Sequence, residues 1–131
     1  MTSIDETFRS VAHPRGLRAA WAAGRFVEAW ESFVEEAISS YWGDLYEFEN
    51  DLGVHDVLEL ALRSDQLDAF EAWAELSKRI RAADERFRAL LSDGPEVRAG
   101  TPWWRERLPP YAGEDFVADA ARLYGVQIAL D

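Results

Sequence analysis

The chain has 131 residues, of which 48% are apolar, and its formal net charge at pH 7 is −11. This length fits one folded domain, and the apolar content excludes a disordered chain. The absence of cysteine excludes disulfides, thiolate catalysis and cysteine-ligated metals. The acidic balance argues against nucleic acid as a partner, because nucleic-acid binders present a basic surface.

The first ten residues carry Asp5 and Glu6 and lack the apolar core of a signal peptide. No apolar run approaches the ~18 residues that a membrane-spanning helix needs. We therefore expect a cytoplasmic protein that has no membrane partner.

The N-terminal third is predicted to hold two helices. Ser3 and Glu6 form a capping box that predicts a helix start, and Pro14 ends this helix. Apolar residues then recur every three or four positions and predict one long helix over 15–42. Gly24 costs about 1 kcal/mol inside that helix, so a turn at Gly24 between two helices is the alternative.

The middle of the chain is predicted to contain three further helices. Asp44 has the position of an N-cap and predicts a short helix over 44–50. The turn residues 50–53 are predicted to break the chain before another helix begins near Val54. A sustained four-three apolar spacing over 66–91 then predicts a long helix with a packing seam.

The C-terminal third is predicted to be irregular before one last helix. Residues 103–108 fit a single helical turn ahead of two prolines, and residues 113–124 fit a helix that Gly125 stops. The tail over 126–130 alternates, but the sequence offers no convincing second strand to pair with it. We therefore expect an extended tail that packs on the helices.

These elements predict an all-α fold, a single-domain bundle of five to six helices with an irregular Trp- and Pro-rich loop before the last one. The bundle is expected to form around the pair 15–42 and 66–91, and the apolar seams predict its core. The expected core residues are Phe8, Leu17, Val27, Trp30, Val34, Ile38, Leu58, Phe70, Leu76, Ile80, Phe87 and Phe116.

The most unusual stretch of the sequence runs from Glu28 to Glu59 and holds ten carboxylates but no Lys or Arg. Of the 25 acidic residues, 15 therefore lie elsewhere, where 14 basic residues nearly balance them. A solvated face usually mixes both signs, whereas a face of one sign steers a charged partner towards it. We interpret the stretch as a contact surface for a basic protein; a solvated face without a partner is the alternative.

Aromatic residues inside this acidic stretch are candidates for the buried anchors of such a contact, because Trp and Tyr dominate binding energy at interfaces. The carboxylates around them would form its charged part. The predicted partner-binding residues are Glu28, Glu31, Glu35, Glu36, Tyr41, Trp42, Asp44, Tyr46, Glu47 and Glu49.

A second candidate surface consists of Trp103, Trp104, Arg105 and Arg107. Paired tryptophans between Pro-rich turns often anchor a loop to the core, which is the interpretation that we favour. A binding hot spot is the alternative, and a stacking platform for a sugar or a base is a third reading that the mixed charge disfavours.

Asp51, His55 and Glu59 are weak candidates for a metal site, because a spacing of four residues would place them on one helix face. Gly53 interrupts that helix in our prediction, and the Glu-x-x-His motif of di-iron bundles does not occur. The alternative is a surface histidine beside acidic neighbours. We expect neither a metal nor another cofactor.

Residues 24–29, together with Phe33, resemble the centre of a tetratricopeptide repeat, which has Gly-x-aromatic-x-Glu-Ala at its turn. Nothing recurs at an offset of ~34 residues, so we interpret this match as incidental.

Three strings of the chain resemble a group of short, uncharacterised, acidic helical bacterial proteins: 50–59, 84–88, and Trp103-Trp104 with 107–109. In size and charge the sequence is also similar to toxin-immunity proteins. This resemblance implies an inhibitor of the immunity or antitoxin type that binds another protein, and it implies no catalytic residues.

No catalytic motif occurs in the sequence, neither a Gly-rich phosphate loop nor Gly-x-Ser-x-Gly nor His-Glu-x-x-His. We therefore do not expect an enzyme. Two function classes stay open: a protein-binding inhibitor of a basic partner, and a helical ligand-binding or scaffolding bundle whose acidic face keeps it in solution. Both a monomer and a homodimer fit these classes.

Overall fold

A computed structural model describes residues 2–131 of the chain as an all-α bundle, which confirms the predicted fold class. The described residues form six α-helices, two short 3-10 helices and one small parallel sheet of two strands. The elements in chain order are α1 (Ile4–Ala12), η1 (Gly16–Arg18), α2 (Ala23–Ser40), α3 (Leu45–Leu62), η2 (Gln66–Ala69), α4 (Glu71–Leu91), α5 (Trp103–Glu106), β1 (Tyr111–Ala112), α6 (Glu114–Tyr124) and β2 (Ala129–Leu130).

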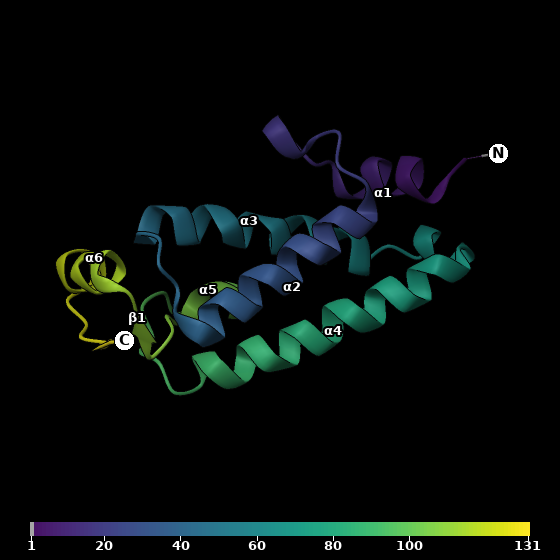
Figure 1. Cartoon of the computed structure of the whole chain (residues 1–131). Helices are drawn as coiled ribbons and strands as arrows, with labels where there is room; N and C mark the ends of the chain where they lie inside the picture. The colour runs from purple at the N-terminus through teal and green to yellow at the C-terminus, as the bar shows by residue number, and fades with distance from the viewer. Residues whose placement is uncertain (1) are drawn as a thin grey trace.

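Helices α2, α3 and α4 form the centre of the fold (Figure 1). Helices α2 and α4 lie side by side and run in the same direction, while α3 packs against α2 and runs in the opposite direction. The N-terminal helix α1 covers one end of this layer, and α6 lies at the other end with the C-terminus. The predicted central pair is therefore confirmed, although α2 is shorter than expected.

The core fills the space between these helices and is rich in aromatic rings. Trp30, Phe33 and Phe87 contact one another with ring centroids 5.3–5.4 Å apart, and Phe48 extends the cluster to Phe116 at 5.0 Å. The predicted core is largely confirmed. Eight of its members are fully buried, namely Phe8, Val27, Trp30, Val34, Leu58, Ile80, Phe87 and Phe116. Three more are partly buried against it, namely Ile38, Phe70 and Leu76.

The prediction of one long helix over 15–42 is wrong, because α2 begins only at Ala23. Gly16 has a φ of +63° and is the first residue of a short 3-10 helix, so no α-helix forms there. The start of α2 is fixed by a residue from another helix, because the backbone N–H of Ala23 donates to the Asp5 carboxylate of α1 at 3.0 Å. Leu17, a predicted core residue, lies in the 3-10 helix and is fully exposed.

The predicted break at 50–53 is also wrong, because α3 continues through Gly53 without interruption. Its predicted N-cap is confirmed: the Asp44 carboxylate accepts the N–H of Glu47 at 2.8 Å. Gly53 instead leaves room for another part of the chain. A Cβ at this position would lie 3.1 Å from Nη1 of Arg18, whose guanidinium donates to the carbonyl of Asn50.

The C-terminal elements follow the prediction except in the tail. A helical turn forms at α5, and α6 ends at Gly125, which has a φ of +65°. The tail was expected to lack a strand partner, but β2 pairs in parallel with β1, with Ala129 opposite Tyr111 and Leu130 opposite Ala112. These strands have two residues each, which is too short for an alternating pattern to reveal them.

Candidate partner-binding surface

The turn between α2 and α3 is held in place by the last helix. After Ser40 the backbone becomes extended at Tyr41, whose carbonyl accepts the N–H of Gly113 at 2.9 Å. Gly113 permits this approach, because a Cβ there would lie 3.1 Å from that carbonyl oxygen and 3.2 Å from the Trp42 ring. The N–H of Leu45 is fixed by the Asp119 carboxylate of α6 at 3.2 Å.

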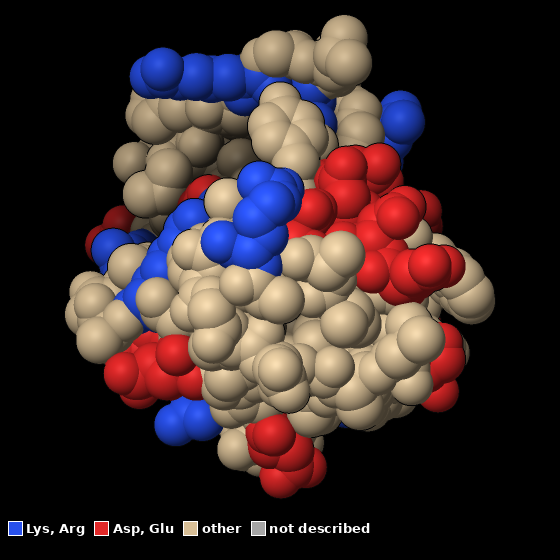
Figure 2. Space-filling model, turned by 90° about the vertical axis from the view of Figure 1, so that its left-hand side faces the viewer, with Lys and Arg blue, Asp and Glu red and all other residues tan. Residues whose placement is uncertain are grey.

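Two aromatic side chains project into solvent from this anchored turn. Trp42 is 70% exposed and Tyr46 is 81% exposed, whereas their neighbours Tyr41 and Leu45 are buried. Figure 2 shows this end of the molecule, where a broad area without charged residues lies beside a cluster of acidic ones. Large exposed aromatics on a rigid backbone are typical of interface anchors.

Tyr41 was predicted to be one of these surface anchors, and that prediction is wrong. Its side chain is only 2% exposed, and its ring packs against Phe33, Phe48 and Phe116. The hydroxyl reaches back towards the surface and donates to Oδ2 of Asp51 at 2.7 Å. Tyr41 therefore supports the turn from inside.

Three carboxylates surround the Tyr41 hydroxyl. Burial raises the pKa of Tyr41 above its usual range, and the hydrogen bond to Asp51 and the charges of Asp51, Glu36 and Glu47 raise this pKa further. Gly43 makes room for Glu47, since a Cβ on Gly43 would lie 2.6 Å from Oε2 of that side chain. Within residues 2–131, no Lys or Arg lies within ion-pair distance of Glu36, Glu47 or Asp51.

Other carboxylates of the acidic stretch are neutralised by arginines from later in the chain. Glu31 pairs with Arg79 at 2.5 Å and Glu35 with Arg86 at 2.5 Å, both across the contact between α2 and α4. The hydrogen bond to Glu31 is the main cause of the raised pKa of Arg79. The charge of Glu28 raises this pKa further, so Glu28 also lies near Arg79. These three glutamates thus face α4.

Glu49 and Asp56 are paired in the same way on α3. Glu49 accepts from Arg98 at 2.6 Å and from the Tyr124 hydroxyl at 2.9 Å, and Asp56 accepts from Arg105 at 2.6 Å. The acidic stretch is therefore not one face. Sequence reasoning missed these pairs because the arginines lie about fifty residues further along the chain. The available signal was that Arg79 and Arg86 directly precede the seam residues Ile80 and Phe87, which pack towards α2.

The second candidate surface turns inwards, which confirms the core-anchor interpretation for Trp104. This side chain is 5% exposed, and its indole N–H donates to Asp56 at 2.9 Å. Trp103 is half-buried, with the guanidinium of Arg88 stacked 4.0 Å from its ring. Arg107 donates to the carbonyl of Gly94 at 2.8 Å. These groups hold the irregular loop against α3 and α4.

The three weak metal candidates go to separate partners. Asp51 accepts from Tyr41, and Glu59 pairs with Arg63 one helical turn further on. The alternative of a surface histidine is wrong, because His55 is fully buried. Throughout the part of the chain that the structure describes, no three His, Asp or Glu side chains are placed to hold a metal ion.

His55 belongs to a buried polar network that sequence reasoning missed. Its Nε2 lies 2.9 Å from Oδ1 of Asp84, and the same oxygen accepts the indole N–H of Trp30 at 2.9 Å. The rings of Trp30 and Trp104 enclose the imidazole at 4.7 and 4.2 Å. The network is largely buried and joins three helices, which indicates a structural role.

No family model, curated protein or solved structure matches this sequence. Among residues 2–131, no helix combines the length and the apolar character needed to cross a membrane.

Proposed function

We propose that the protein is an acidic protein-binding module that holds a basic partner at its α2–α3 turn. The binding surface, called the turn surface below, consists of Glu36, Trp42, Tyr46, Glu47 and Asp51. The observation that carries the proposal is the position of two exposed aromatic rings beside carboxylates that have no arginine partner in the described chain.

The two kinds of residue have different tasks in this proposal. Trp42 and Tyr46 provide most of the binding energy, because each buries a large apolar area at small cost in side-chain entropy. The carboxylates attract a basic partner and raise the rate of association more than the affinity. At physiological ionic strength charges act over about 8 Å, so a cluster of carboxylates acts together where isolated ones do not.

A basic partner is favoured over a second copy of this chain. In a two-fold dimer each surface meets itself, so the turn surface would bring Glu36, Glu47 and Asp51 of one copy against the same residues of the other. Like charges facing each other at an interface cost several kcal/mol, at an order of magnitude, unless they are neutralised. A partner rich in Lys or Arg removes that cost.

The class of partner follows from size and charge. Small acidic proteins that block a basic toxin fit both properties of this chain, with its 131 residues and a net charge of −11. We therefore propose an inhibitor of the immunity or antitoxin type. In such a protein a rigid, preformed surface is an advantage, because little ordering is needed on binding.

The experiment is a quantitative capture of basic proteins from the source organism on the immobilised protein. The double variant Trp42→Ala, Tyr46→Ala should reduce retention of the partner by about tenfold or more, because it removes both aromatic anchors. The control variant Leu17→Ala, Leu60→Ala removes two other exposed apolar side chains and should leave retention unchanged. Equal retention by all three proteins would refute the proposal.

A further inference from the structure

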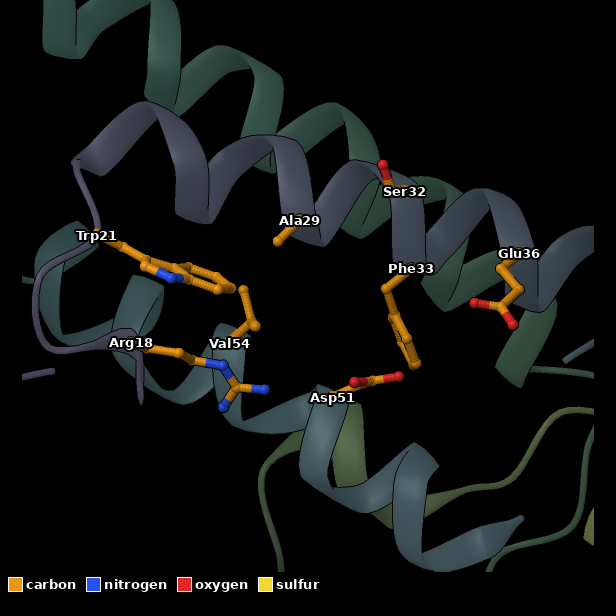
Figure 3. Close-up of a pocket in the computed structure, with 8 residues that line it drawn as sticks. All are labelled: Arg18, Trp21, Ala29, Ser32, Phe33, Glu36, Asp51 and Val54. Atoms are coloured by element: carbon orange, nitrogen blue, oxygen red, sulfur yellow. The ribbon is translucent and has the colours of Figure 1, made fainter. Parts of the chain in front are cut away.

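A small pocket opens between η1, α2 and α3, next to the turn surface (Figure 3). Its volume is about 200 Å³. Cavities that hold cofactors or drug-sized molecules typically measure about 300–1,000 Å³, so this pocket suits a single side chain rather than a cofactor. It is open to solvent on one side.

Four of the residues that line the pocket are apolar. The Trp21 ring closes one end and the Phe33 ring the other, while Ala29 of α2 and Val54 of α3 lie between them (Figure 3). The methylene groups of a long side chain could pack on these walls. The Trp21 ring already has the guanidiniums of Arg25 and Arg18 at 4.3 and 5.8 Å from its centroid, and Phe33 is only 5% exposed, so the rings contribute apolar contact.

The pocket has charged groups of both signs, and the Arg18 guanidinium points towards Asp51 (Figure 3). Asp51 and Glu36 lie at the Phe33 end, and Arg18 enters from the Trp21 end (Figure 3). The Arg18 guanidinium donates to the carbonyl of Asn50 at 3.0 Å, so part of its hydrogen-bonding capacity is already used. Asp51 uses one oxygen for the Tyr41 hydroxyl and keeps the other for a ligand.

We propose that this pocket binds one arginine or lysine side chain of the protein partner, with the cationic head between Asp51 and Glu36. The inference rests on the proposed function and deepens it, because Glu36 and Asp51 belong to the turn surface. The stem of the bound side chain packs along Ala29 and Val54, and the head faces the two carboxylates at the Phe33 end. Charge complementarity selects the occupant: two carboxylates without an ion-pair partner in residues 2–131 line the pocket, against the single guanidinium of Arg18.

The test uses N-acetyl-arginine methylamide as the probe and its citrulline analogue as a neutral match of nearly the same shape. Both are titrated into the ¹⁵N-labelled protein, and the Trp21 indole and the amides of Ala29 and Val54 report on the pocket. The arginine probe should give saturable shifts with a Kd on the order of 1 mM, as expected for one side chain. The citrulline probe should bind at least about tenfold more weakly.

Two variants locate the binding in the pocket. The double variant Glu36→Gln, Asp51→Asn should weaken the arginine probe by about tenfold, since it removes two partly exposed charges. Ala29→Met fills the cavity without changing any charge and should abolish the shifts. The control Glu75→Gln, Glu85→Gln makes the same change of charge on the outer face of α4 and should leave binding unchanged.

The inference is overturned if the arginine probe gives no saturable shift at the pocket, if citrulline binds equally well, or if the control variant weakens binding as much as the pocket variant. Thermal unfolding of each variant shows that it is folded before titration. The proposed function is tested separately by the Trp42→Ala, Tyr46→Ala variant. If that variant loses the partner while the arginine probe does not bind the pocket, the proposed function stands and only the pocket proposal is rejected.

Discussion

His55 and Asp84 form a buried contact of 2.9 Å that links α3 to α4. The same Asp84 oxygen accepts the indole N–H of Trp30, so one carboxylate ties three helices together. The side chain of Asp84 is 15% exposed and that of His55 is fully buried. The contact lies directly beneath the paired tryptophans of the C-terminal loop.

Replacement of Asp84 should be among the most destabilising polar substitutions in the protein. Asp84→Ala leaves the indole N–H of Trp30 and Nε2 of His55 without an acceptor, and we expect a loss of about 3 kcal/mol in the free energy of unfolding. Asp84→Asn keeps an oxygen at the same place and should cost less than half of that. Urea unfolding measures both; equal losses for the two variants would contradict the assigned network.

The seam of α4 should carry much of the stability of the bundle. Ile80 and Phe87 are fully buried, so Ile80→Ala and Phe87→Ala should each cost about 2–5 kcal/mol. The control Lys78→Ala lies on the exposed face of the same helix and should change stability by less than about 0.5 kcal/mol. Chemical denaturation provides the values, and losses below about 0.5 kcal/mol at both seam positions would mean that the seam is not core.

Replacement by alanine should be tolerated at Gly53 but not at Gly94. At Gly53 the new Cβ meets only the end of the Arg18 side chain at 3.1 Å, and alanine gains about 1 kcal/mol of helix propensity, so Gly53→Ala should stay within about 1 kcal/mol of the wild type. At Gly94 the Cβ would lie 1.7 Å from the backbone oxygen of Leu108, so Gly94→Ala should cost about 3 kcal/mol or more. Comparable melting temperatures would show that the loop is packed differently.

Tyr41 should make the protein less stable at alkaline pH. Burial, followed by the hydrogen bond and charge of Asp51 and the charges of Glu36 and Glu47, raises the pKa of Tyr41 in the folded state. Above the unfolded value of about 10 the unfolded chain releases this proton while the folded chain keeps it, so stability falls as pH rises. Below pH ~10 the contribution of Tyr41 to the free energy of unfolding is fully present.

The variant Tyr41→Phe removes this ionisable group and should lose stability less steeply than the wild type above pH ~10. A remaining decline is expected, because burial and Glu49 also raise the pKa of Tyr124. Unfolding curves at a series of pH values give the two slopes. Parallel slopes for the variant and the wild type would mean that Tyr41 is not held in its protonated form by the fold.

Local signals in the sequence were enough to predict most of the elements. Ser3 and Asp44 cap the helices that follow them, and Gly125 stops the last helix, because each acts on backbone groups within a few residues. The apolar seam of α4 was equally clear, since Ile80 and Phe87 are one heptad apart and both are buried.

The errors arose where a partner lies far away in the sequence. Asp5 determines where α2 begins by capping Ala23, and Arg18 fills the space that Gly53 leaves on α3. Neither contact leaves a local pattern. For the same reason the acidic stretch was interpreted as one face, although Arg79 and Arg86 neutralise part of it from another helix.

The candidate site was predictable in part. Trp42 and Tyr46 are exposed, as the predicted anchor role requires, while Tyr41 was misassigned because composition cannot tell which of three nearby aromatics turns inwards. The buried pair of His55 and Asp84 was missed entirely, since twenty-nine residues separate the two side chains along the chain.

The central claim is that the turn surface, and not the overall acidity of the chain, binds the basic partner. The most direct measurement compares the association rate of the captured partner with two variants of identical net charge. One carries Glu36→Lys and Glu47→Lys in the turn surface, and the other carries Glu75→Lys and Glu85→Lys on the exposed face of α4. The first should associate at least about tenfold more slowly at low salt, with a flatter salt dependence, while the second stays close to the wild type. Equal rates for the two variants would contradict the account.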